Sequence, residues 1–206
     1  MNFMTSPTGI EKRSMEIIAP YLEQYNLTDE EVKIYSRIIH ASGDPEYAPI
    51  IRIHQEAIQM AKQSLLHGKD IYTDVEMVRT GINKTRLANY GGKVHCLIAD
   101  EAVANMAKKE QITRSMAAMR TFGKHLDGAI VAIGNAPTAL FEVLRMIEME
   151  SIRPALIIGV PVGFVGAAES KEHLIATSPV PYITVRGNKG GSPIAASITN
   201  ALLYML

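Results

Sequence analysis

Cysteine is almost absent from this sequence of 206 residues, which contains only Cys96. A single cysteine excludes a disulfide within the chain, and it excludes a zinc ribbon or an iron–sulfur cluster built from cysteine ligands. The six histidines are far apart and none forms an H-x-x-x-H pair, so we expect no helix-borne zinc site and no metal in the protein. Low cysteine use also favours a reducing compartment, the cytoplasm.

Net charge is absent as well, since 21 lysine and arginine residues balance 21 aspartate and glutamate residues. A general nucleic-acid binder or a polybasic membrane anchor carries a basic surplus, so we expect neither kind of partner. The longest uncharged apolar run, residues 155–168, is too short to cross a bilayer, and the N-terminus lacks the pattern of a secretory signal. With 47% apolar and 20% charged residues, the composition indicates a folded, soluble protein.

The first third of the sequence has apolar residues at helical spacing. It predicts a helix over residues 10–25 that Pro20 kinks or splits, a second helix from a capping box at Thr28 to His40, and a third over residues 50–66. The remainder alternates short apolar runs with helical patterns. The predicted strands are 69–73, 94–99, 129–133, 155–160 and 182–185, and the predicted helices are 100–108, 112–124, 138–150, 167–175 and 194–206.

Strand–helix alternation of this kind predicts one α/β domain over residues 1–206, with a five-stranded parallel sheet covered by helices on both faces. In such sheets, ligands bind outside the carboxyl ends of the strands. Glycine in the loops at these ends lets the backbone approach a ligand closely. The loops expected at this edge are 73–74, 99–100, 134–137, 159–163 and 186–191.

The motifs of several common enzyme classes are missing. No two glycines have the G-x-G spacing of a dinucleotide site, and neither G-x-x-x-x-G-K-[ST] nor G-x-S-x-G occurs. These absences exclude a Rossmann-type cofactor site, a phosphate-binding P-loop and a standard serine hydrolase. The protein either catalyses a reaction that needs none of them or only binds a ligand.

Arg37 and His40 are three residues apart, so they share one face near the end of the second predicted helix. Histidine changes charge near neutral pH, and an anion bound next to Arg37 would favour the protonated imidazole. Ligand binding could thus prepare His40 as a general acid. The alternative is structural, with both side chains capping the last carbonyl groups of the helix.

Other candidates for anion binding are scattered along the chain. Arg114 falls in the first turn of its predicted helix, where the helix dipole disfavours a cation and an anionic partner would relieve the conflict. Two glycine loops lead into helix N-termini, and Lys189 adds a positive charge to one of them. Ser14 interrupts an apolar stripe, where a serine is usually bonded to its own helix. Ordinary turns and ion pairs explain each feature separately, but together they indicate a cleft with several anion-binding groups, which suits a polycarboxylate ligand.

Five blocks of residues are specific enough to carry a family resemblance. They are RIIHASG at 37–43, DVEMV at 74–78, IGNAPTAL at 133–140, GVPVGFVGAAESK at 159–171 and RGNKGGSP at 186–193. With these blocks, almost the whole chain resembles the precorrin-8X methylmutase (cobalt-precorrin-8 methylmutase) family of corrin-ring synthesis. The resemblance implies a flavodoxin-like three-layer sandwich with an N-terminal helical segment, which works as a homodimer with its site near the subunit boundary.

The activity that the resemblance implies is the isomerisation of a polycarboxylate tetrapyrrole without a cofactor. A methyl group moves from C-11 to C-12 of precorrin-8X or cobalt-precorrin-8 in a 1,5-sigmatropic shift, giving hydrogenobyrinate or cobyrinate in cobalamin biosynthesis. A methyltransferase that uses S-adenosylmethionine would need a glycine-rich loop after the first predicted strand, and the loop here is acidic without glycine. A corrinoid carrier without catalytic activity is the other alternative.

The resemblance also assigns site residues. His40 matches the catalytic histidine of the family, and Ser42 stands where the family pattern predicts cysteine. We add Lys189 from its glycine loop as a substrate contact, and on this interpretation Arg37, Arg114 and Lys189 converge on one cleft. The substrate contacts that the resemblance implies are Ser14, Arg37, Arg114 and a residue in the segment that contains Asn83 and Arg86.

Overall fold

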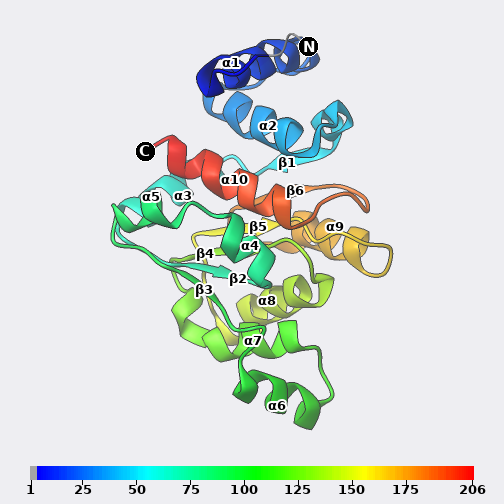
Figure 1. The fold of residues 1–206 in the computed structure, drawn as a ribbon. Coiled ribbons are helices and arrows are strands. Elements are labelled where there is room, and N and C mark those ends of the chain that lie inside the picture. Colours follow the sequence, from blue (N-terminus) through cyan, green and yellow to red (C-terminus); the bar gives the residue numbers. More distant parts are fainter. Residues whose placement is uncertain (1–3) are drawn as a thin grey trace.

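The computed structural model describes residues 4–206 (Figure 1). The N-terminal part is helical, as predicted, and the first helix gives way to a short 3₁₀ turn at Pro20. The predicted capping box is confirmed, because the Thr28 hydroxyl accepts a hydrogen bond from the Glu31 amide and the Glu31 carboxylate accepts one from the Thr28 amide. The helices of this part are α1 (Pro7–Ile18), η1 (Ala19–Tyr21), α2 (Asp29–Ser42) and η2 (Pro45–Ile50).

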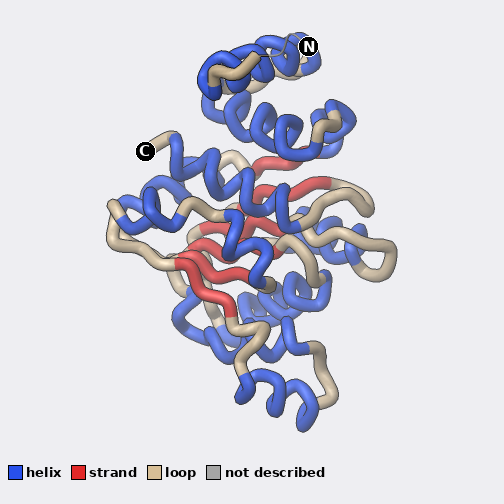
Figure 2. Tube along the Cα trace, viewed as in Figure 1, coloured by secondary structure: helices blue, strands red, loops and turns tan. Residues whose placement is uncertain are grey.

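A six-stranded sheet lies at the centre of the molecule, in the order β1-β6-β5-β4-β2-β3 (Figure 2). Five of its strands are parallel, and β1 pairs with β6 in the antiparallel direction. The predicted five-stranded sheet is therefore wrong by one strand. The strands are β1 (Ile51–Ile53), β2 (Ile71–Thr73), β3 (Val94–Cys96), β4 (Ile130–Ile133), β5 (Leu156–Gly159) and β6 (Tyr182–Val185).

The additional strand lies where the sequence predicts the start of a helix over residues 50–66. Ile51 and Ile53 are β-branched and alternate with Arg52, which suits a strand at the edge of a sheet. The helix itself, α3 (Ala57–Leu66), begins only after this strand. These isoleucines fall at helical spacing with the apolar residues of α3. Periodicity alone therefore predicts that they belong to the helix.

Helices cover both faces of the sheet, as predicted. Along β4, Ile130 and Ala132 point to one face, and Val131 and Ile133 point to the other. The core on the first face includes residues of α2, α3, α4, α5 and α10, and the core on the second face includes residues of α7, α8 and α9. The remaining helices are α4 (Glu76–Gly81), α5 (Lys84–Ala88), α6 (Glu101–Glu110), α7 (Arg114–Phe122), η3 (Gly123–Leu126), α8 (Pro137–Glu150), α9 (Ala167–Thr177) and α10 (Ser192–Tyr204).

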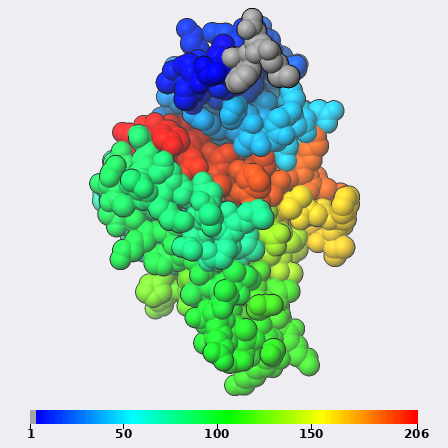
Figure 3. All heavy atoms as spheres, viewed as in Figure 1, coloured from blue at the N-terminus to red at the C-terminus, as the bar shows by residue number. Residues whose placement is uncertain are grey.

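Two groups of helices lie at opposite ends of the molecule (Figure 1). At one end α1 packs on α2, and α2 packs on α10. At the other end α6 packs on α7 through small apolar side chains. Figure 3 shows α1 and α2, in blue, directly above the red end of α10. Within residues 4–206, every helix is too short or too polar to span a membrane.

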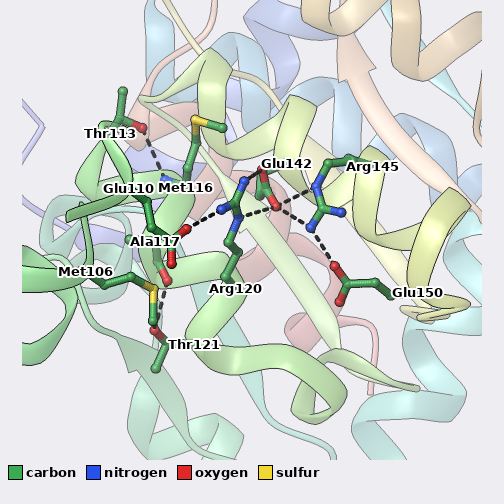
Figure 4. Close-up of polar contacts among 10 residues, drawn as sticks. All are labelled: Met106, Glu110, Thr113, Met116, Ala117, Arg120, Thr121, Glu142, Arg145 and Glu150. Atoms are coloured by element: carbon green, nitrogen blue, oxygen red, sulfur yellow. Dashed lines mark hydrogen bonds and ion pairs between the residues drawn. The ribbon is translucent and has the colours of Figure 1, made fainter. Parts of the chain in front are cut away.

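A buried glutamate connects α7 and α8 (Figure 4). The side chain of Glu142 on α8 is only 1% exposed and accepts hydrogen bonds from Nε of Arg120 (2.8 Å) and Nε of Arg145 (2.8 Å). Arg120 also pairs with Glu110 of α6, and Arg145 pairs with Glu150. Burial acts to raise the pKa of Glu142, but the hydrogen bonds from the two arginines outweigh burial and lower that pKa below its ordinary value. The network therefore stabilises the fold when Glu142 is ionised.

We predict that Glu142→Gln lowers the free energy of unfolding by about 1–3 kcal/mol at pH 7, because charge-assisted hydrogen bonds are weakened. Since the pKa is lower in the folded state, this stabilisation is present above the ordinary glutamate pKa of 4.5 and is lost as the pH falls through the folded-state value. Urea unfolding at pH 7 and at decreasing pH measures both effects. The exposed Glu148→Gln on the same helix should change stability by less than about 0.5 kcal/mol. Equal stability of the two variants at pH 7 would contradict this role of the network.

Candidate active site

A cavity of about 540 Å³ lies between the N-terminal helices and the end of α10. It contains both members of the predicted arginine–histidine pair, and we call it the His40 cavity. The expected ligand loops at the carboxyl ends of the strands contribute none of its lining, so this cavity does not lie where the sequence predicts the cleft. Its lining residues come from α1, α2 and α10 and are Pro7, Ile10, Glu11, Arg37, His40 and Tyr204.

Helix α2 holds Arg37 and His40 on the side that borders the cavity. Ile34 and Ile38 anchor α2, because both are fully buried in the core that α2 shares with α10. Arg37 forms an ion pair with Glu11 of α1. The imidazole of His40 is exposed, and within residues 4–206 it forms no hydrogen bond with the protein. Both of its ring nitrogens are therefore available to a ligand.

The C-terminus of α2 is capped without the side chain of Arg37 or His40. The amide of Gly43 donates to the carbonyl oxygen of Ile39 (2.8 Å), and the hydroxyl of Ser42 donates to that of Ile38 (2.9 Å). Gly43 has a φ of 66°, a left-handed conformation that glycine adopts without steric strain. The structural alternative for the arginine–histidine pair, capping of this helix, is therefore wrong.

Tyr204, the last residue of α10, brings three predicted site residues together. Its hydroxyl accepts a hydrogen bond from Nδ2 of Asn83 (3.0 Å). The guanidinium carbons of Arg86 and Arg37 lie 5.0 Å and 5.7 Å from the centre of its ring. Sequence reasoning missed Tyr204, because it belongs to no motif and lies far along the chain from the residues that it contacts.

The contacts distinguish Asn83 from Arg86, which the sequence did not. Asn83 caps α5 by accepting a hydrogen bond from the amide of Arg86 (3.0 Å), and with the bond to Tyr204 both ends of its side chain are used. Arg86 donates Nε to the carbonyl oxygen of Leu203 (2.7 Å). Within the described part of the chain, its Nη atoms pair with no carboxylate. Arg86 is therefore the better placed of the two to bind an anion.

Ser14 lies on α1, one turn from the wall of the His40 cavity. Its hydroxyl donates to the carbonyl oxygen of Ile10 (2.8 Å), as expected for a serine inside a helix. Ile10 itself lines the cavity. The bond uses the proton of the hydroxyl and leaves its oxygen as an acceptor for a ligand.

Lys189 is held by two carboxylates of the protein. Its Nζ bonds to Asp44 (2.6 Å) and Glu46 (2.9 Å), and these hydrogen bonds raise the pKa of Lys189 above its ordinary value. It lines a second cavity, of about 330 Å³, beside the end of α2. The two ion pairs attach the 186–191 loop to the residues that follow α2. A ligand carboxylate at Lys189 would compete with both of them.

Lys171 of α9, which sequence reasoning missed, supports the same loop from inside the protein. Its side chain is fully buried, and its Nζ donates to the carbonyl oxygen of Lys189 (2.6 Å). Burial lowers the pKa of Lys171 to about 8. The residue lies in one of the five family blocks, but no local pattern marks a lysine in that block as buried.

Arg114 does not reach the His40 cavity of its own chain. It is the first residue of α7, which packs on the face of the sheet opposite to α2 and α10. Figure 1 shows α2 and α7 well separated, and Arg114 lines another cavity, of about 410 Å³, with Lys108. The crossover from β3 to β4 places α7 on that face. Within one chain, the three residues predicted to converge on one cleft line three different cavities: Arg37 the His40 cavity, Arg114 the one with Lys108, and Lys189 the one beside the end of α2. Their convergence stays a prediction for an assembly of chains.

The side chain of Asp74 occupies one of the predicted anion sites, the backbone amides that precede α8. Asp74, fully buried after β2, accepts hydrogen bonds from the amides of Gly134 (3.0 Å), Asn135 (2.8 Å) and Ala136 (2.7 Å). Burial raises the pKa of Asp74, although the three N–H donors oppose that effect. The amides before α8, which the sequence predicts as donors to a ligand, therefore bind Asp74 instead.

The His40 cavity can bind carboxylates and transfer a proton. Arg37 at the wall of the cavity and Arg86 on the ring of Tyr204 supply positive charge that suits carboxylate groups, and His40 supplies an imidazole with both nitrogens free. Among the described residues, no three His, Cys, Asp or Glu side chains are grouped as a metal site. The arrangement is therefore suited to general acid–base chemistry on an anionic ligand.

Known proteins resemble the chain over nearly its full length. Residues 9–205 match the family described as precorrin-8X methylmutase. The chain is 44% identical to the cobalt-precorrin-8 methylmutase of Priestia megaterium, over 95% of this chain and 87% of the relative, and 43% identical to the precorrin-8X methylmutase of Pseudomonas aeruginosa, over 98% and 97%. A solved structure of the precorrin-8X methylmutase from Thermus thermophilus matches with a TM-score of 0.89 and 36% identity, over 96% of this chain and 95% of that one. The chain therefore belongs to the precorrin-8X methylmutase family, a family of isomerases in corrin biosynthesis.

Proposed function

We propose that the protein moves a methyl group from C-11 to C-12 of precorrin-8X or cobalt-precorrin-8. The methyl group bonds to C-12 as its bond to C-11 breaks, so the product, hydrogenobyrinate or cobyrinate, has the same atoms as the substrate. A 1,5-sigmatropic shift of this kind needs no methyl donor and no redox cofactor. The family to which the chain belongs supports this reaction.

The observation that carries the proposal is the free imidazole of His40 at the wall of a cavity that also contains Arg37. Carboxylates bound close to an imidazole favour its protonated form. His40 then lends a proton to a ring atom, lowers the barrier to the shift, and takes a proton back as the conjugated product forms. General-acid catalysis of this kind contributes about 10²–10⁴-fold to a rate.

The arms of the substrate end in carboxylates, and we infer that Arg37 and Arg86 bind two of them. The oxygen of Ser14 accepts a hydrogen bond from a donor on the ligand, and Asn83 holds the ring of Tyr204 next to the two arginines. Lys189 becomes a contact only where a ligand carboxylate displaces its own partners. Fixed arms hold the flexible macrocycle in a reactive shape.

Arg114 supports an assembly of two chains. Because α7 lies on the opposite face of the sheet from α2, a role for Arg114 in substrate binding requires a second copy of the chain. We therefore propose a homodimer in which Arg114 of one chain completes the His40 cavity of the other.

We assign a flavodoxin-like fold to residues 1–206 as one domain. Taken along the chain, the five parallel strands have the order 2-1-3-4-5 of flavodoxin-like sheets, which supports this assignment. The single cysteine supports a cytoplasmic location.

We predict that the purified protein converts precorrin-8X into a more conjugated product without any added cofactor, seen as a shift of the absorption spectrum. His40→Ala should slow this conversion by at least about 10²-fold, because the proton donor is lost. Hydrogenobyrinate binding, measured by calorimetry, should stay within about 3-fold of wild type. His125→Ala, an exposed histidine on η3, is the matched control and should keep full activity.

Two results would contradict this account of His40. An unchanged spectrum together with tight ligand binding would make the protein a corrinoid carrier. A loss of binding as large as the loss of rate would make His40 a binding residue rather than a general acid.

We predict that heterodimers of His40→Ala and Arg114→Met chains are active although neither variant is active alone. One of the two sites then combines an intact His40 with an intact Arg114, so two-tag purification should yield about half of the wild-type rate per dimer. Heterodimers of His40→Ala and Arg37→Met should stay inactive, because both residues belong to one cavity of one chain. Inactive heterodimers in the Arg114 experiment would rule out the shared site.

A further inference from the structure

Tyr204 is a large aromatic residue in an exposed position. The residue is 49% exposed, whereas the isoleucine and leucine residues of α10 are buried in the core. It lines the His40 cavity, and none of the five family blocks contains it. Core packing therefore does not explain this side chain, and its contacts at the cavity have to be considered.

Two arginines pack on the ring of Tyr204. The guanidinium carbon of Arg86 lies 5.0 Å from the ring centre, and that of Arg37 lies 5.7 Å from it. The negative face of an aromatic ring attracts guanidinium groups at this distance. Arg37 comes from α2 and Arg86 from α5, so the ring is a contact that cations of two separate helices share. The ring therefore keeps two like charges close to one point of the fold, although they repel each other.

Further contacts fix both arginines and the ring. Nδ2 of Asn83 donates to the Tyr204 hydroxyl (3.0 Å), which sets the position of the ring. Nε of Arg86 donates to the carbonyl oxygen of Leu203 (2.7 Å), and Nη2 of Arg37 pairs with Glu11. Within residues 4–206, Nη1 of Arg37 and both Nη atoms of Arg86 bond to no acceptor of the protein. These donors remain available to an anion beside the ring of Tyr204, which itself lines the cavity.

We propose that Tyr204 is a positioning residue, which holds Arg37 and Arg86 as a pair that binds two carboxylates of one ligand at the His40 cavity. The inference rests on the proposed function for the nature of the ligand, a polycarboxylate tetrapyrrole. Guanidinium groups that are already held in place lose less side-chain entropy on binding than mobile ones. The ring therefore strengthens ligand binding without taking part in the proton transfer.

The test is calorimetric titration of the full-length protein with hydrogenobyrinate at low and high salt. Tyr204→Leu removes the ring and should weaken binding by about 10-fold at low ionic strength. At about 1 M NaCl the defect should shrink to about 2-fold, because charge–charge contacts are screened. Tyr204→Phe keeps the ring and should bind within about 3-fold of wild type. In turnover, Tyr204→Leu should raise KM and change kcat by less than about 3-fold.

Tyr21→Leu is the matched control, since Tyr21 is 48% exposed and does not line the His40 cavity. It should leave binding unchanged. Should Tyr204→Leu fail to fold by circular dichroism, Tyr204→Gln replaces it, because a half-exposed position accepts a polar side chain.

Two outcomes would overturn the proposal: wild-type affinity in the ring-deleted variant, or a defect of the same size at every salt concentration, as expected from a purely structural role. Uroporphyrin, a different tetrapyrrole polycarboxylate, distinguishes a failure of the proposed function from a failure of the proposed role of Tyr204. If wild type binds uroporphyrin in a Tyr204-dependent and salt-dependent way but does not bind hydrogenobyrinate, the proposed function is wrong and the arginine pair stands. Binding of neither ligand overturns both.

Discussion

The packing of α2 on α10 is the contact on which the site depends. Ile38 of α2 and Leu202 of α10 are fully buried in one core that continues into the sheet. Each such side chain contributes about 1.5–3 kcal/mol when it is buried, so the core rather than the site fixes the two helices. Arg37 and His40 of α2 therefore meet Tyr204 of α10 in one cavity, where Arg37 packs on the ring of Tyr204.

Several charged groups are used by the fold itself. Glu142 lies between two arginines, Lys189 bonds to two carboxylates, and Asp74 accepts three backbone amides. Arg86 differs, because within residues 4–206 its terminal nitrogens pair with no carboxylate. A net charge of zero therefore does not mean that every charge is balanced locally, since Arg86 packs on the ring of Tyr204 with no carboxylate partner among the described residues.

The sequence predicts those parts of the fold and the site that local chemistry decides. The capping box at Thr28 and the buried apolar strands are local signals, and the structure has both. Strand β1 is only three residues long and forms by pairing with β6, a long-range contact that periodicity does not report. In the same way, Arg37 and His40 were predictable because one helix face carries both. The role of Tyr204 and the position of Arg114 could not be predicted from the sequence, because tertiary packing decides which distant helices meet.

A crystal structure of the protein with bound hydrogenobyrinate would test most directly where the reaction takes place. We predict that the macrocycle lies in the His40 cavity with a ring atom within hydrogen-bonding distance of the imidazole. Two of its carboxylates should bind Arg37 and Arg86, and Arg114 of the partner subunit should contact a further one. A macrocycle bound at the carboxyl edge of the sheet, with His40 in solvent, would contradict the account.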